Sequence, residues 1–185
     1  GPGLADEETP LVVDGPPAVA ADAGVIAELE HRLFETPDME GIAMRYGFLY
    51  GPGTWFNADG DVARQVREQQ FPIVGNGEGA WSWLHTEEGA LSTVAAAEQG
   101  NPGIYLIAND QPLAVREWLP AFGQWLHAPS PPQISVEDAL KASGGDTVYY
   151  GTQMRGVSNA KAKRELNFQP RPLEWIVDTA APHAS

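Results

Sequence analysis

Apolar and polar residues change their spacing along the chain, from a period of about 3.6 residues in some segments to continuous apolar runs in others. The helical period predicts helices over residues 19–34, 61–70, 86–99, 115–126, 134–142 and 159–166. The apolar runs, bounded by Gly, Pro or Asn, predict strands over residues 42–50, 71–75, 80–85 and 103–108. Strands that alternate with helices favour an α/β domain with a partly parallel sheet.

The same pattern divides the chain into three parts. Residues 1–17 are acidic and rich in Pro, so we expect an extended N-terminal segment. Residues 18–178 hold the predicted helices and strands and are expected to form one domain, and residues 179–185 a tail. We find no internal repeat and no linker that would separate a further domain.

Composition and charge narrow the function classes. None of the 185 residues is Cys, which excludes disulfides, thiolate metal sites and a Cys nucleophile and is consistent with a cytoplasmic protein. The net charge of −14 repels nucleic acid and anionic membranes, so we expect neither as a partner. No apolar run approaches the ~18 residues of a membrane span. The four His residues form no cluster with carboxylates along the sequence, so no metal site is expected.

Five segments carry a family resemblance through their order and spacing. They are Arg45–Gly53 (RYGFLYGPG), Phe71–Gly77 (FPIVGNG), Trp83–Ala90 (WLHTEEGA), Gly103–Ala108 (GIYLIA) and Ser158–Pro170 (SNAKAKRELNFQP). Together they resemble the C-terminal half of extended short-chain dehydrogenases, the NAD-dependent epimerase/dehydratase family, over about residues 5–177. The resemblance implies an α/β fold with a partial Rossmann-like parallel sheet edge and a small α+β substrate-binding lobe.

Two features of that family are missing from these 185 residues. We find no glycine-rich turn between a strand and a helix that could hold a cofactor pyrophosphate. The Tyr-x-x-x-Lys pair is expected near residues 20–30, but residues 20–28 read AADAGVIAE. The pair is needed because an ammonium must lower the pKa of the phenol before the phenol can act near neutral pH. No catalytic residue is therefore identified, and NAD or NADP is expected only if other residues supply the cofactor half; otherwise no cofactor is expected.

The resemblance nevertheless implies binding residues. Tyr50, Gly51, Pro52 and Gly53 would line the nicotinamide side of a cofactor pocket. The residues expected to contact substrate are Trp83, His85, Tyr150 and Arg155. Each of these side chains also has a structural interpretation. Tyr46 and Tyr50 could be core aromatics on one strand face, Trp83 a core residue, His85 a structural histidine and Arg155 part of a solvated cationic surface.

The leading hypothesis is an atypical NAD(P)-dependent epimerase, dehydratase or reductase that acts on a nucleotide sugar or related small molecule. A ligand-binding module without redox chemistry, or a truncated and catalytically silent homologue, is the main alternative. A cofactor-free cyclase or isomerase would need an acid/base pair, for which His85 with Glu87 or Tyr150 is the candidate. The strand from Arg45 to Tyr50 is apolar on both faces and needs a neighbour on each side, so we expect a homo-oligomer or a complementing chain.

Overall fold

A computed structural model describes residues 3–177. Its helices are α1 (Pro17–Glu35), α2 (Asp61–Arg67), α3 (Thr86–Gln99), α4 (Val115–Trp125), α5 (Val136–Thr152), α6 (Ala160–Leu166) and α7 (Glu174–Val177). Its strands are β1 (Ile42–Tyr46), β2 (Phe48–Tyr50), β3 (Ile73–Val74), β4 (Ala80–Trp81), β5 (Trp83–His85), β6 (Gly103–Ile107), β7 (Leu113–Ala114) and β8 (Gln133–Ile134). The α/β class is confirmed. The expected tail at 179–185 lies outside the described residues.

Two parallel strand pairs follow one another along residues 42–50. β1 lies parallel to β6, and β2 lies parallel to β5. The change of partner occurs at Gly47, whose N–H donates to Ile107 O, while the next N–H, of Phe48, donates to Ser82 O. A Cβ on Gly47 would lie 2.7 Å from Ser82 O, so the close approach of these backbones requires Gly. The strands predicted over 42–50 and 80–85 are therefore each divided in two.

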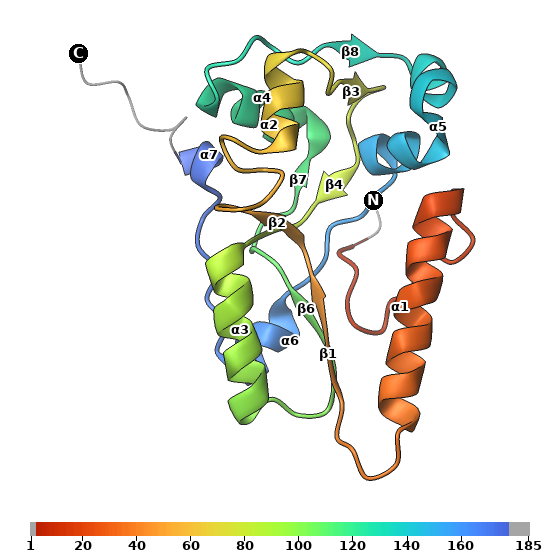
Figure 1. Ribbon diagram of the computed structural model, residues 1–185, viewed down its shortest axis with the longest axis vertical. Coiled ribbons are helices and arrows are strands. Elements are labelled where there is room, and N and C mark those ends of the chain that lie inside the picture. Colours follow the sequence, from red (N-terminus) through yellow and green to blue (C-terminus); the bar gives the residue numbers. More distant parts are fainter. Residues whose placement is uncertain (1–2, 178–185) are drawn as a thin grey trace, which may run out of the picture.

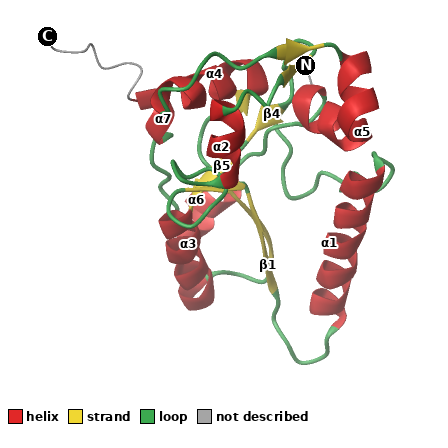
Figure 2. Cartoon of the chain, turned by 45° about the horizontal axis from the view of Figure 1, so that its top comes forward, coloured by secondary structure: helices red, strands yellow, loops and turns green. Residues whose placement is uncertain are grey.

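Helices cover this strand layer, and a lobe extends from one end of it. Figure 1 shows β1 and β6 between α1 on one side and α3 with α6 on the other. Helices α2, α4 and α5 gather with β3, β4, β7 and β8 at the top of the molecule (Figures 1 and 2). In this lobe β3 lies parallel to β8, and β4 lies antiparallel to β7. The expected partial parallel sheet with a small α+β lobe is thus present.

Aromatic side chains dominate the core between the two parts. The buried aromatic residues of this cluster are Tyr50, Phe56, Trp81, Trp83, Trp118, Phe122 and Trp175. Many of their rings meet edge to face, for example Trp83 with Trp175 at a centroid distance of 5.1 Å. This geometry is favoured because the positive edge of one ring meets the negative face of the next. Trp118 lies on the buried face of α4 and is fully buried.

The N-terminal segment is tied to the domain by specific contacts. Ala5 forms a parallel bridge with Val157. The carboxylate of Glu7 accepts a hydrogen bond from Leu106 N–H on β6. Further along β6, the Lys161 ammonium donates to Ile104 O. Two side chains thus occupy backbone groups on the edge of β6 that faces away from β1.

The other edge of this strand layer is formed by β1. Among residues 3–177, β1 pairs with β6 only. Large apolar side chains on β1, β2, α1 and α3 are exposed: Val25, Ile26, Leu29, Phe34, Tyr46, Leu49, Leu91 and Val94. Exposed apolar residues at an open strand edge are typical of a surface that another polypeptide covers.

Some local predictions were wrong, for identifiable reasons. The helix predicted over 134–142 continues to Thr152, with a break at Gly144, where φ is +83°. Tyr46 is 42% exposed although it shares a strand face with buried Tyr50, because the backbone changes partner at Gly47 between them.

Candidate functional site

The lobe contains a cavity of about 480 Å³ formed by the described residues. Its walls come from α2, α5, the strand ends near β2, β3 and β4, and the loop that follows the Gly51–Gly53 turn. The aromatic residues that line it are Phe48, Trp55, Phe56, Phe71, Trp81 and Tyr150. A volume of this size suits a small organic molecule.

The aromatic walls hold one another in place. Phe48 stacks on Trp81 with ring centroids 4.0 Å apart. Phe56 and Tyr150 each meet the Phe48 ring edge to face, at 6.3 Å and 6.2 Å. Trp81 Nε1 donates a hydrogen bond to the backbone oxygen of Tyr150, which fixes the indole ring relative to α5. The cavity wall is therefore pre-organised without a ligand.

Few polar side chains reach the cavity. Those among its lining residues are Asp61, Gln65 and Thr147, together with the Tyr150 hydroxyl. Asp61 already accepts hydrogen bonds from Arg64 and Gln65, which hold its pKa below the usual range. Burial, followed by the nearby carboxylate of Asp22, raises the pKa of Tyr150, so its phenol stays neutral near pH 7. The lining includes neither Lys nor Arg.

The turn expected to face a cofactor directly follows β2, and none of its residues lines the cavity. Gly51 and Gly53 adopt φ values of +98° and +80°, a region that favours Gly. A Cβ on Gly51 would lie 2.6 Å from His85 Nε2, so the missing side chain also makes room for the imidazole. The Thr54 hydroxyl donates to Gly51 O and closes the turn.

A cluster of titratable groups surrounds this turn. Because His85 Nδ1 accepts from a backbone N–H, the proton of the neutral imidazole is on Nε2, which lies 3.8 Å from Glu174 Oε1. Glu88 is buried and accepts from Arg171 N–H. Burial and the carboxylates of Glu88 and Glu174 raise the pKa of Tyr50 far above its ordinary value. Tyr50 is therefore a neutral phenol in this structure and not a base.

The structure separates the four residues expected to contact substrate. Tyr150 lines the cavity. Trp83 is completely buried in the aromatic core behind the cavity wall, and His85 lies at the Gly51 turn beside Tyr50, with ring centroids 5.1 Å apart. Arg155 is exposed and is not among the lining residues. Trp83, His85 and Arg155 are therefore not among the residues that line this cavity, and their contact with substrate stays a prediction.

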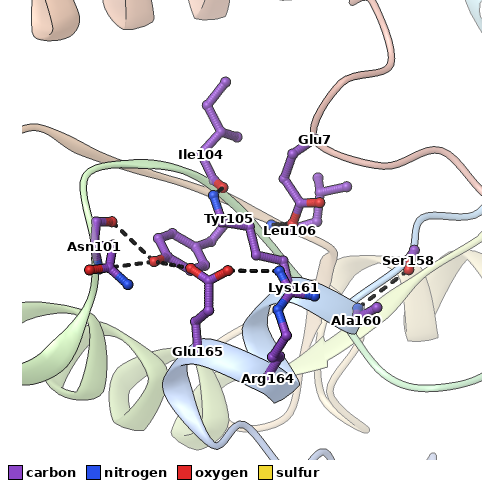
Figure 3. Close-up of polar contacts among 10 residues, drawn as sticks. All are labelled: Glu7, Asn101, Ile104, Tyr105, Leu106, Ser158, Ala160, Lys161, Arg164 and Glu165. Carbon is purple, nitrogen blue, oxygen red and sulfur yellow. Dashed lines mark hydrogen bonds and ion pairs between the residues drawn. The ribbon is translucent and has the colours of Figure 1, made fainter.

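The acid/base pairs considered for this chain are also not formed. The Glu87 carboxylate pairs with Arg171, and Glu87 meets His85 through its backbone N–H. A Tyr–Lys neighbourhood does occur between β6 and α6 (Figure 3), where Lys161 Nζ lies 4.3 Å from the centre of the Tyr105 ring. However, burial and the hydrogen bond to Glu165 raise the pKa of Tyr105, the opposite of what a catalytic phenol requires. We assign this cluster a structural role.

Several cavity residues escaped the sequence analysis. Phe56, Gln65, Phe71 and Thr147 line the cavity but belong to loops or to helices with ordinary surface patterns. The signal available in the sequence was the density of aromatic residues between positions 48 and 83, which indicates an aromatic cluster without showing which faces line a cavity.

Two further structural findings concern the described residues alone. Residues 3–177 contain no group of three or more His, Asp or Glu side chains placed to hold a metal ion. Across the same part of the chain, no helix has the length and apolar character needed to cross a membrane.

The parallel strand pairs and the small lobe give the class of fold: the chain folds like NAD-dependent epimerase/dehydratase proteins of the short-chain dehydrogenase type. The resemblance seen in the sequence is thus confirmed. At the sequence level the chain is 36% identical, over 176 residues, to a 3-diazoavenalumate denitrifying reductase from a Streptomyces species. No protein-family model matches the chain.

Solved structures show the shared fold directly. The chain matches a dTDP-glucose 4,6-dehydratase from Streptomyces venezuelae with a TM-score of 0.63 and 20% identity, over 94% of this chain and 52% of that one. It matches a human epimerase family protein with a TM-score of 0.71 and 16% identity, over 94% and 57%. The match with the curated reductase likewise covers 95% of this chain but only 58% of the reductase. The similarity therefore concerns little more than half of each relative.

Proposed function

We propose that this chain is the substrate-binding part of a nicotinamide-dependent reductase of the short-chain dehydrogenase type. The observation that carries the proposal is the 36% identity with a curated reductase over nearly the whole chain. The shared fold and a pre-organised cavity of about 480 Å³ support it. In this proposal the chain binds and orients a small molecule, and its lobe excludes water from the bound face. A cytoplasmic location, where reduced nicotinamide cofactors are available, is part of the proposal.

NAD or NADP is the cofactor we propose, held mainly by residues outside these 185. The matching dehydratase structure has NAD bound, and the human protein was solved with NADPH. The present residues do not fit a whole dinucleotide, because the sequence has no glycine-rich turn between a strand and a helix. The contribution of this chain would be the Tyr50–Gly53 turn, where two Gly residues leave the backbone open to a neighbour. When bound, the cofactor would supply the hydride.

The open edge of β1 supports a partner that completes the protein. Within the described residues, β1 has a strand neighbour on one side only, and apolar side chains are exposed beside it. We propose that a complementing chain, or a second copy of this chain, covers this surface. Such a partner would also bring the cofactor-binding residues next to the Tyr50–Gly53 turn.

A ligand-binding module without redox chemistry is the second candidate. It is favoured because residues of this chain line the whole described cavity, whereas no acid/base pair was found among the residues described. The cyclase or isomerase hypothesis has less support, because Glu87 is engaged by Arg171 and Tyr150 belongs to the cavity rather than to the His85 cluster.

Calorimetric titration with NADPH and NADH distinguishes these candidates. The titration compares this chain produced alone with the protein purified from the cells that make it. We expect the cell-derived protein to bind one of the two cofactors and the isolated chain to bind neither with comparable affinity. Failure of the cell-derived protein to bind either cofactor would contradict the reductase proposal and favour the binding module.

A further inference from the structure

We infer that the cavity of the lobe binds a flat aromatic ring rather than a nucleotide sugar. The inference rests on the proposed function for the reaction class, but the ligand class follows from the cavity itself. It changes the expectation drawn from the sequence, where a nucleotide sugar stood first. The juxtaposition that carries it is a set of six aromatic side chains around one space of about 480 Å³.

The aromatic residues come from widely separated parts of the chain. Phe48 lies on β2, Trp55 and Phe56 lie in the loop after it, Trp81 ends β4 and Tyr150 lies on α5. Phe48 and Trp81 stack on each other, and Trp81 also meets Trp118 in the core, so the ring surfaces that line the cavity are held in fixed positions. Aromatic pairs gain stability beyond simple burial when they stack offset or meet edge to face. A flat ring can make such contacts with several walls at once.

Trp55 is the member of this set that a ligand would cover. Its side chain lines the cavity but is 73% exposed, whereas Trp81 and Phe56 are each 6% exposed. An exposed Trp at the rim of an apolar cavity leaves a large apolar surface in water. A ring bound against Trp55 would remove that surface from water and gain about 25 cal/mol per Å² of apolar area.

Charge argues against a nucleotide sugar in this cavity. A diphosphate is recognised by Arg, Lys or a set of backbone N–H groups. The lining contains no Arg or Lys, and its one carboxylate, Asp61, is already paired with Arg64. Arg155, the cation expected to contact substrate, is exposed and is not part of the lining. The protein as a whole carries a charge of −14, which further disfavours a dianionic ligand.

The first test is calorimetric titration of the cell-derived protein with three probes. These are 2-naphthol, its saturated analogue decahydro-2-naphthol and UDP-glucose. We expect 2-naphthol to bind at least about fivefold more tightly than the saturated alcohol, because aromatic contacts add to the burial that both alcohols share. Equal binding of the two alcohols, or tighter binding of UDP-glucose than of 2-naphthol, would overturn the inference.

Two variants locate the bound ring. Trp55→Ala should weaken 2-naphthol binding about 10-fold, equivalent to about 1.4 kcal/mol. Leu140→Ala, at an exposed apolar residue of α5 outside the cavity lining, is its matched control and should leave the affinity unchanged. Gln65→Trp should fill the cavity and abolish binding, whereas Gln70→Trp, an exposed position just past α2, should not. Circular dichroism of each variant confirms that it is folded. Unchanged affinity in folded Trp55→Ala and Gln65→Trp would contradict the inference.

The outcomes separate this inference from the reductase proposal. If the protein binds a cofactor but not 2-naphthol, the reductase proposal is supported and the inference of an aromatic ligand is overturned. If the protein binds 2-naphthol in the cavity but binds no cofactor, the inference of an aromatic ligand is supported and the reductase proposal is overturned.

Discussion

Gly51 combines two requirements at a single residue. Its φ of +98° disfavours any side chain, and a Cβ would lie 2.6 Å from His85 Nε2. Gly53 has a similar φ of +80°, but a Cβ there would meet no atom within 4 Å. We therefore predict that Gly53→Ala lowers the free energy of unfolding by about 1 kcal/mol, from backbone strain alone. Gly51→Ala should lower it by at least about 1 kcal/mol more, because the imidazole must also move.

Urea unfolding of the two Ala variants checks this prediction. Equal losses would show that the contact with His85 carries no energetic weight and that backbone strain explains both values. A smaller loss for Gly51→Ala than for Gly53→Ala would contradict the packing described for this turn.

Asp110 links the end of β6 to α6 and should contribute a pH-dependent part of stability. Hydrogen bonds from Asn159 and then from Lys163 lower its pKa. A carboxylate whose pKa is lower in the folded state stabilises above its unfolded pKa of about 3.9 and loses this contribution as pH falls through the folded value. The pair with Lys163 is about half exposed, so we expect Asp110→Asn to cost no more than about 1 kcal/mol near neutral pH.

The cost of Asp110→Asn should shrink when unfolding is measured at about pH 3. Asp14→Asn, at an exposed position for which no contact is described, is the matched control and should show little effect at either pH. A cost for Asp110→Asn that is the same at both pH values would contradict an electrostatic origin.

Individual site residues were only partly predictable. The positive φ of Gly51 and Gly53 follows from a Gly-Pro-Gly turn, and the burial of Tyr50 follows from its apolar strand. The separation of Tyr150 from His85 could not be predicted, because it depends on how α5 packs against β4. That packing rests on a tertiary contact, the hydrogen bond from Trp81 Nε1 to Tyr150 O.

At the scale of elements, the edges of the strand layer at β6 and at β1 differ in what contacts their backbone groups. Glu7 and Lys161 bind backbone groups of Leu106 and Ile104 on β6 (Figure 3). In the described part of the chain, β1 has a strand neighbour on one side only. A strand edge whose groups are bound by charged side chains resists further pairing. This difference supports our proposal that a further strand pairs with β1 rather than with β6.

Removing the Glu7 carboxylate should loosen the β6 edge locally. A hydrogen bond to a charged group contributes about 1.5–3 kcal/mol. We predict that Glu7→Ala accelerates hydrogen exchange of the Leu106 amide about 10-fold or more, with little effect on exchange elsewhere in β6. Glu8→Ala changes an exposed neighbour and should leave the Leu106 amide unaffected. Similar exchange rates in both variants would show that Glu7 does not protect this edge.

The long elements were predictable because their periodicity is carried by many residues. The helices at α1, α3, α4 and α6 were expected near their observed positions. The two-residue strands β7 and β8 and the four-residue helix α7 were missed, since so few residues give no period. The break at Gly47 was missed for another reason: it arises from the approach of Ser82 O, which is a contact between distant segments.

At the scale of the whole molecule, two surfaces account for the proposed function. The aromatic cavity lies within the lobe, and the open edge of β1 lies beside exposed residues of α1 and α3. A net charge of −14 opposes association of two identical acidic copies unless apolar burial offsets it. A complementing polypeptide of lower acidity would avoid this repulsion and supply the cofactor-binding residues.

Native mass spectrometry of the protein purified from its own cells, followed by denaturing mass analysis of the same sample, tests this central claim most directly. We expect additional polypeptide mass beyond these 185 residues, together with an increment that matches a nicotinamide dinucleotide. A bare assembly of this chain alone, without such an increment and without binding of added NAD(P), would contradict the reductase account.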